Sequence, residues 1–192
     1  MIKRARNQPR ALEVPQASDP DIMQRLAGGE TGALGELYDR YHERVRRFVA
    51  LATSDAEDVD DLVQGTFLAA GKSAGRYDGR ASCRPWLFGI AAQLVRRRRQ
   101  SFKRLLAVLS SFSATRSTLV DPRPALEASR DVERALGRIS EAKRVTYLLA
   151  EVEGLSCEEI ADVLGVPIGT VWTRCHAARR ELRRAMEEGN ET

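Results

Sequence analysis

The sequence has few of the residues that build disulfide or metal-bound frameworks. It contains three cysteines and two histidines in 192 residues. Cys83, Cys157 and Cys175 stand far apart and form no CxxC pair, and His176 has no second ligand pair at a usable spacing. A disulfide framework or a structural zinc site needs regularly spaced ligands of these types. We therefore expect reduced thiols, no metal site and a cytoplasmic location.

Long apolar runs are also absent. No stretch approaches the roughly 20 apolar residues that a membrane-spanning helix needs. The N-terminal segment "MIKRARNQPRALEVPQ" is charged without an apolar centre, so we expect a flexible basic arm over residues 1–17 rather than a secretory signal. There is no paired acid and base, metal cluster or phosphate-binding loop. The sequence thus predicts no enzymatic activity, no cofactor, no small-molecule substrate and no membrane insertion.

Charge is unevenly spread along the chain. The formal net charge is only +4. Residues 72–104 are strongly basic with Asp78 as their one acid, whereas residues 55–61 hold five acids and no base. Such asymmetry favours two differently charged partners, although solvated helix faces are the alternative.

Apolar spacing of three and four residues predicts an all-α protein. A continuous stripe runs through residues 31–52, beginning at Leu34, Leu37 and Tyr38. A Ser-, Thr- and Pro-containing stretch predicts a flexible linker over residues 101–128. We expect two small helical domains joined by this linker. The domains are residues 18–100 and 129–187, and a short tail follows at residues 188–192.

The segment "SCEEIADVLGVPIGTVWTRCHAARREL", residues 156–182, predicts a helix-turn-helix. Ser156 and Glu159 form a capping box, and Gly165 marks the turn. The second helix has an apolar stripe, formed by Val171, Cys175, Ala178 and Leu182. In this motif the second helix enters the major groove with its first residues at the base edges, while arginines contact phosphates. The expected DNA-binding residues are Thr170, Trp172, Thr173, Arg174, His176, Arg179 and Arg180.

The stretches "EGLS", "EEIADVLGV", "GTV" and "RRELR" resemble the promoter-binding C-terminal domain of extracytoplasmic-function sigma factors. In the N-terminal half, "DLVQGTFLAA" resembles the sigma-factor helix that binds RNA polymerase, and "RPWLFGIAAQLVRRRRQ" resembles the helix that faces the melted promoter element. The resemblance covers about residues 19–100 and 129–186. It implies a sigma factor that initiates transcription, with core RNA polymerase, promoter DNA and an anti-sigma factor as partners.

The same resemblance assigns residues in the N-terminal domain. Those expected to contact core polymerase are Asp58, Asp61, Leu62, Gln64 and Phe67. Those expected to bind the melted element are Arg76, Tyr77, Arg80, Arg84, Arg96 and Arg97. A positive channel with flat side chains is what single-strand binding requires.

Some alternatives stay open from the sequence. Trp172 stands where the family often has a basic residue, and it either packs on a thymine methyl group or lies flat on its own domain. Cys83 is either a passive thiol or a redox sensor, and Trp86 is either core or a stacking platform. The alternative function is an operator-binding regulator whose N-terminal half serves as a sensor or dimerisation domain.

Overall fold

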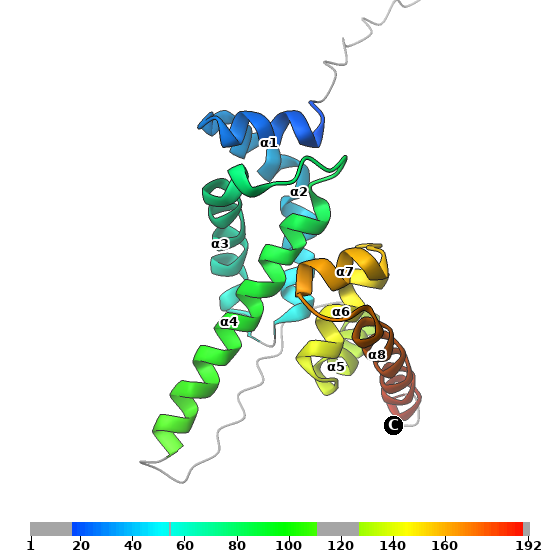
Figure 1. Ribbon diagram of the computed structural model, residues 1–192. Coiled ribbons are helices and arrows are strands. Elements are labelled where there is room, and N and C mark those ends of the chain that lie inside the picture. The colour runs from blue at the N-terminus through cyan, green and yellow to red at the C-terminus, as the bar shows by residue number, and fades with distance from the viewer. Residues whose placement is uncertain (1–16, 54, 111–126, 190–192) are drawn as a thin grey trace, which may run out of the picture.

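The computed structural model describes residues 17–53, 55–110 and 127–189. Every regular element in these ranges is helical, which confirms the predicted all-α class (Figure 1). The elements are α1 (Asp19–Ala27), α2 (Thr31–Ala52), α3 (Asp58–Ser73), the 3₁₀ turn η1 (Ala74–Arg76), α4 (Arg84–Ser110), α5 (Glu127–Arg138), α6 (Glu141–Glu151), α7 (Cys157–Leu164) and α8 (Ile168–Gly189). Most of the expected N-terminal arm, the linker residues 111–126 and the last three residues lie outside the described ranges.

Local signals in the sequence set several of the helix ends. The Ser18 hydroxyl accepts a hydrogen bond from the Asp21 backbone N–H, and the Asp21 carboxylate accepts one from the Ser18 N–H. Ser156 and Glu159 make the same reciprocal pair at the start of α7. Gly165 ends α7 with a φ of 63°, a left-handed conformation that glycine adopts at little cost. The predicted capping box and turn of the helix-turn-helix are therefore confirmed.

The N-terminal domain is built around α2, α3 and α4. Its core includes Leu37 and Phe48 from α2 and Phe88 from α4, and the Phe48 and Phe88 rings meet edge to face at 5.3 Å between centroids. Each such buried side chain contributes about 1.5–3 kcal/mol. The predicted stripe of α2 is correct apart from its N-terminal end, where Leu34 is half-buried and Tyr38 is exposed.

A buried carboxylate fixes α1 to the segment that leads into α4. Asp19 accepts hydrogen bonds from the Tyr41 hydroxyl at 2.5 Å, from Arg40 at 2.7 Å and from the Cys83 backbone N–H at 2.9 Å. Burial by itself raises the pKa of Asp19, but these hydrogen bonds outweigh it and hold the pKa below its ordinary value. These hydrogen bonds thus position the loop before α4, which carries several of the residues predicted to bind the melted DNA strand.

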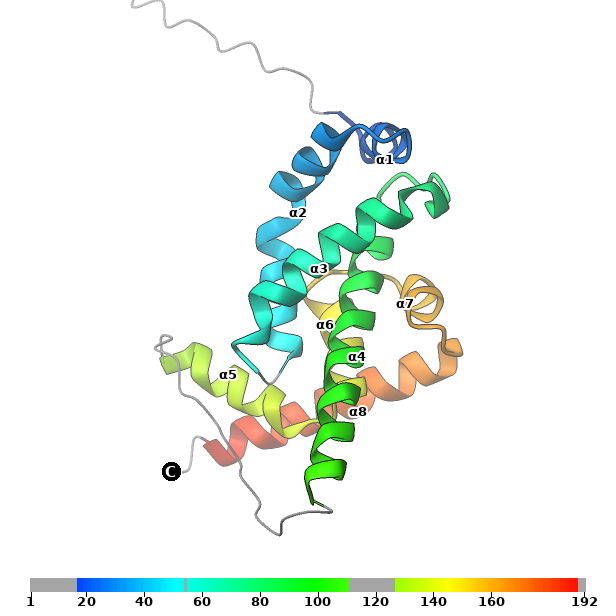
Figure 2. The ribbon, with the colours of Figure 1, turned by 90° about the vertical axis from the view of Figure 1, so that its left-hand side faces the viewer.

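Helix α4 is longer than the sequence suggested. It continues to Ser110, so the first ten residues of the expected linker are helical. Residues 102–109, "FKRLLAVL", consist mostly of good helix formers and contain no glycine or proline to stop the helix. The C-terminal end of α4 projects away from the rest of the protein in both ribbon views (Figures 1 and 2).

In the C-terminal domain, α8 packs against α5, α6 and α7. The predicted α8 stripe is confirmed, because Val171, Cys175, Ala178 and Leu182 are all buried. The two domains also touch each other: α7 lies beside α4, and α6 contacts α2 and α4 (Figures 1 and 2).

Candidate nucleic-acid interface

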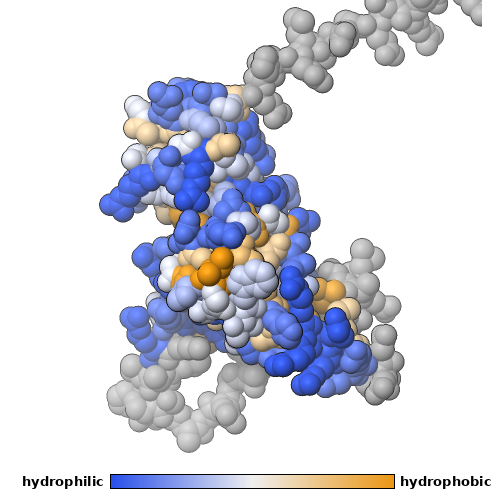
Figure 3. All heavy atoms as spheres, turned by 45° about the vertical axis from the view of Figure 1, so that its right-hand side comes forward, coloured by the Kyte–Doolittle hydropathy of each residue, from blue (hydrophilic) through white to orange (hydrophobic). Residues whose placement is uncertain are grey.

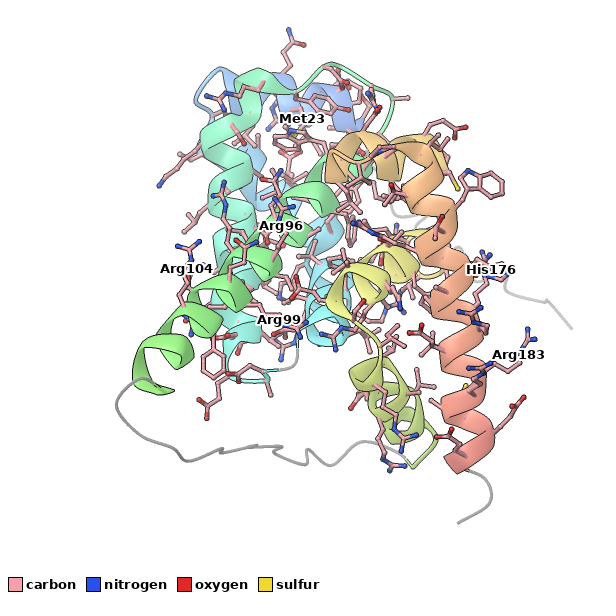
Figure 4. All side chains as sticks on the ribbon, turned by 60° about the horizontal axis from the view of Figure 1, so that its bottom comes forward. Met23, Arg96, Arg99, Arg104, His176 and Arg183 are labelled. Carbon is pink, nitrogen blue, oxygen red and sulfur yellow. The ribbon has the colours of Figure 1, made fainter. Side chains whose placement is uncertain are left out.

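The outer surface of α8 is polar and open to solvent. His176 and Arg183 point away from the body of the protein (Figure 4). In the space-filling view, hydrophilic side chains cover most of this side of the molecule, with a smaller hydrophobic area near its middle (Figure 3). Of the seven residues predicted to bind DNA in this segment, five are exposed and two are half-buried; the exposed ones are Trp172, Thr173, His176, Arg179 and Arg180, and the half-buried ones are Thr170 and Arg174.

Trp172 is 64% exposed, so it does not lie flat on its own domain. Trp172 lies on the second turn of α8, on the solvent side of the helix, whereas the neighbouring Val171 is buried. This exposure does not fit the alternative of packing on its own domain, and contact with a thymine methyl group stays a prediction.

The other polar residues of α8 differ in how free they are. The Thr173 hydroxyl donates to the Gly169 carbonyl oxygen at 2.8 Å, a bond within the helix. Arg179 forms an ion pair with Glu151 of α6. Within the ranges that the structure describes, Arg174 and Arg180 form no ion pair, so their charges are available to phosphates.

The four consecutive arginines of α4 divide into two pairs. Arg98 is bound to Asp58 of α3, and Arg99 forms an ion pair with Glu141 of α6 at 3.1 Å. Arg96 and Arg97 are exposed, and among the described residues they form no ion pair. Arg96 and Arg104 extend outward from α4 (Figure 4). Of the four arginines in this run, the two predicted from the sequence to bind nucleic acid, Arg96 and Arg97, are thus the two without an ion pair among the described residues.

The loop before α4 holds its predicted residues in different settings. Arg76 is exposed, whereas the Tyr77 ring meets the half-buried Trp86 edge to face at 5.7 Å. Burial raises the pKa of Tyr77 to about 12, and its hydroxyl donates to the Arg80 carbonyl oxygen. Arg84 is half-buried, and in the described part of the chain its Nε has no hydrogen-bond partner. Tyr77 and Trp86 therefore form a small aromatic pair at the base of the loop.

Cys83 is not placed for redox chemistry. Its side chain is fully buried, and burial raises the pKa of the thiol to about 12. Because the thiolate is the reactive form, such a thiol is inert at neutral pH. The passive alternative is the one that the structure supports.

Helix α3 presents only part of its predicted contact set to solvent. Asp61 and Gln64 are exposed, whereas Leu62 and Phe67 belong to the core and Asp58 is buried against Arg98. The spacing explains this division, because side chains three and four residues apart share one face of a helix.

Two exposed apolar residues beside this face were not predicted from the sequence. Leu68 is 50% exposed and continues the face of Asp61 and Gln64 by one helical turn. Tyr38 of α2 is 40% exposed, and its ring lies 4.9 Å from that of Phe67. Leu68 does not share the spacing of the buried residues of α3, so its exposure could have been predicted from the sequence. We call Asp61, Gln64, Leu68 and Tyr38 the α3 face.

The described residues contain neither a metal-binding cluster nor a membrane-spanning helix. No group of three or more His, Cys, Asp or Glu side chains there is placed to hold a metal ion. No helix in the same ranges has the length and apolar character that crossing a membrane requires.

Comparison with known proteins identifies both domains. Residues 37–104 match the profile of Sigma-70 region 2, and residues 129–182 match that of Sigma-70, region 4. The chain is 31% identical to the RNA polymerase sigma factor CarQ of Myxococcus xanthus, over 86% of this chain and 96% of that protein. It is 28% identical to the ECF RNA polymerase sigma factor SigM of Mycobacterium tuberculosis, over 89% of this chain and 86% of that protein.

A solved structure shares the fold of both domains. It contains CnrH in complex with the cytosolic domain of CnrY, and it matches at 26% identity with a TM-score of 0.63. The match covers 90% of this chain and 99% of CnrH. Both domains, in the same order and over nearly the full length, thus agree with one group of transcription initiation factors. The chain belongs to the extracytoplasmic-function sigma factors of the sigma-70 family.

Proposed function

We propose that this sigma factor binds core RNA polymerase through the α3 face. The face combines the exposed carboxylate of Asp61 with an amide and two exposed apolar side chains. Acidic groups steer and orient a basic partner, while exposed apolar groups supply buried area at the interface. The buried Asp58, Leu62 and Phe67 act indirectly, by holding α3 in position.

The reading helix α8 binds the upstream promoter duplex. Trp172 reaches base edges and packs on a thymine methyl group, a recognised form of apolar readout. Arg174 and Arg180 contact phosphates and set the register of the helix. The observation that carries this proposal is the outward position of Trp172 on a helix whose other face is fully buried.

The melted promoter element binds along the loop and α4. Arg76, Arg96 and Arg97 supply unpaired positive charge, and Arg80 and Arg84 flank the aromatic pair of Tyr77 and Trp86. Stacking of unpaired bases contributes about 1–3 kcal/mol per base. Binding energy of this kind drives strand opening, and the protein itself catalyses no covalent step.

We also propose a cytoplasmic site of action and an anti-sigma partner. The similar protein CnrH was solved with the cytosolic domain of CnrY bound to it. The α3 face and the loop before α4 are exposed surfaces to which an inhibitor that competes with polymerase could bind.

The test is a pull-down of core polymerase with the full-length protein, free of any inhibitor. Asp61→Asn is expected to weaken retention, whereas Glu43→Gln, the same loss of charge on a residue of α2 that is 89% exposed, is the matched control. Binding of wild type to promoter duplex as a dimer, with no affinity for polymerase, is the result that favours the operator-binding alternative instead.

A further inference from the structure

Two large apolar side chains are exposed in the first two turns of α8. Ile168 is 43% exposed and Trp172 is 64% exposed. They stand four residues apart, so they are neighbours on one face of the helix. His176 lies one further turn along that face, and it points away from the body of the protein (Figure 4). We call Ile168 and Trp172 the α8 apolar pair.

The same two turns offer few groups that can hydrogen-bond the edge of a base. Residues 168–173 contain no Arg, Lys, Asn, Gln, Asp or Glu. The Thr173 hydroxyl already donates to the Gly169 carbonyl oxygen, and Thr170 is half-buried. Guanine is read mainly by Arg or Lys, adenine by Asn or Gln, and cytosine by Glu or Asp. The start of α8 is therefore poorly equipped for these three bases and well equipped for an apolar target.

The apolar target on a base edge in the major groove is the C5-methyl group of thymine. In a helix-turn-helix, the first residues of the second helix are the ones that meet the base edges. Four residues rise by about 6 Å along an α-helix, whereas successive base pairs are about 3.4 Å apart. The two side chains of the α8 apolar pair therefore face different base pairs, one or two steps apart.

Gly169, between the two members of the pair, suits a close approach to DNA. A Cβ atom placed on it would have no described atom of the chain within 4 Å, and its φ is not positive. Neither packing among the described residues nor backbone geometry thus calls for a glycine here. Inside a helix, glycine lowers stability relative to alanine, but it lets the backbone come close to a ligand.

We propose that Ile168 and Trp172 read thymine methyl groups on two base pairs of the upstream promoter element. The inference rests on the proposed binding of that duplex by α8. It adds Ile168, which was not predicted from the sequence to bind DNA, and it defines the target as a 5-methylpyrimidine at two positions. Arg174 and Arg180 hold the phosphates while the α8 apolar pair selects the bases.

The test compares thymine with deoxyuridine, which pairs in the same way but lacks the methyl group. Wild-type holoenzyme selects a duplex from a randomised upstream element, and each thymine in it is then replaced in turn by deoxyuridine. Fluorescence anisotropy measures the affinity of holoenzyme assembled with full-length wild type, Ile168→Ala, Trp172→Ala or Val132→Ala. Val132 of α5 is 43% exposed, as Ile168 is, and serves as the matched control. All three side chains are exposed, so these variants are expected to fold as wild type does.

We expect deoxyuridine to weaken wild-type binding at two positions, by about fourfold at each, as for the loss of one buried methyl group. Ile168→Ala removes this effect at one position and Trp172→Ala removes it at the other, whereas Val132→Ala keeps both.

Three results overturn the inference. Equal affinity for thymine and deoxyuridine at every position rules out methyl reading, as does a selected element without thymine. An effect of deoxyuridine that Ile168→Ala leaves intact at every position removes Ile168 from the pair. If wild-type holoenzyme binds promoter duplex at none of the concentrations used, the proposed function of α8 fails, and methyl reading falls with it.

Discussion

The Nε of Arg98 on α4 donates a hydrogen bond of 2.8 Å to the Oδ2 of Asp58 at the start of α3. The pair joins two helices forty residues apart in sequence and removes Asp58 from the acids that a partner can contact. Asp61, one turn further along α3, is exposed and makes no such bond in the described part of the chain. Two acids of one predicted contact set thus lie in different environments, one buried against Arg98 and one exposed.

Asp58→Asn and Asp61→Asn are expected to have different effects. Because Arg98 is mostly exposed, loss of its partner lowers the free energy of unfolding by only about 1 kcal/mol. Asp61→Asn leaves the stability within about 0.5 kcal/mol of wild type and weakens polymerase binding. Urea denaturation and polymerase pull-down on each variant measure the two effects. Equal loss of polymerase binding in both variants at unchanged stability contradicts the division.

Asp19→Asn is expected to lower stability in a pH-dependent way. Asp19 has a pKa below its ordinary value of 3.8, so its carboxylate stabilises the folded protein above that pH, and this contribution is lost as the pH falls through the native pKa. The variant loses about 1–3 kcal/mol at neutral pH, as expected for hydrogen bonds to a charged group. Urea denaturation of wild type and of Asp19→Asn, from pH 7 to pH 3, measures the free energy of unfolding of each protein.

The two unfolding free energies should converge toward the acidic end of that range. If the difference between the two unfolding free energies stays constant down to pH 3, the charge of Asp19 is not the source of the lost stability.

Trp172→Arg is expected to change promoter choice without changing stability. The side chain is largely exposed, so the free energy of unfolding stays within about 0.5 kcal/mol of wild type. The control is the neighbouring buried residue, where Val171→Ala costs about 2 kcal/mol from lost burial and a cavity. Selection of promoters from a randomised upstream element reads out the preference, and an unaltered selected sequence removes Trp172 from base reading.

Arg174→Ala is expected to weaken duplex binding for all promoter sequences alike. A phosphate contact carries no base information, and its loss reduces the slope of log affinity against log salt by about 1. Titration of duplex promoter with polymerase holoenzyme at several salt concentrations measures the slope. A changed sequence preference with an unchanged salt slope indicates a base contact instead.

Much of the fold could be predicted from the sequence because its signals are local. Capping boxes, a turn glycine and the stripe from Val171 to Leu182 each depend on residues within one or two helical turns. The extension of α4 to Ser110 lies inside the expected linker, where residues 102–109 are mostly good helix formers and no glycine or proline stops the helix. The burial of Asp58 depends on Arg98, which approaches it only when α4 packs on α3.

The candidate site shows the same limit. Residue type and spacing marked Arg96 to Arg99 as one basic run, but only the packed structure shows that Asp58 and Glu141 engage two of the four. The ion pair between Arg44 and Glu153 joins residues 109 positions apart, and no periodicity in the sequence connects them. Long-range pairing of this kind is set by domain contact rather than by local pattern.

Run-off transcription by purified core polymerase tests the central claim most directly. The template carries a promoter selected by the wild-type protein, and the reactions contain core enzyme alone, core with wild type, or core with Asp61→Asn. We expect a defined transcript only when sigma factor is added to core enzyme, with a lower yield from Asp61→Asn than from wild type. Tight binding of the protein to that template with no promoter-directed transcript contradicts it.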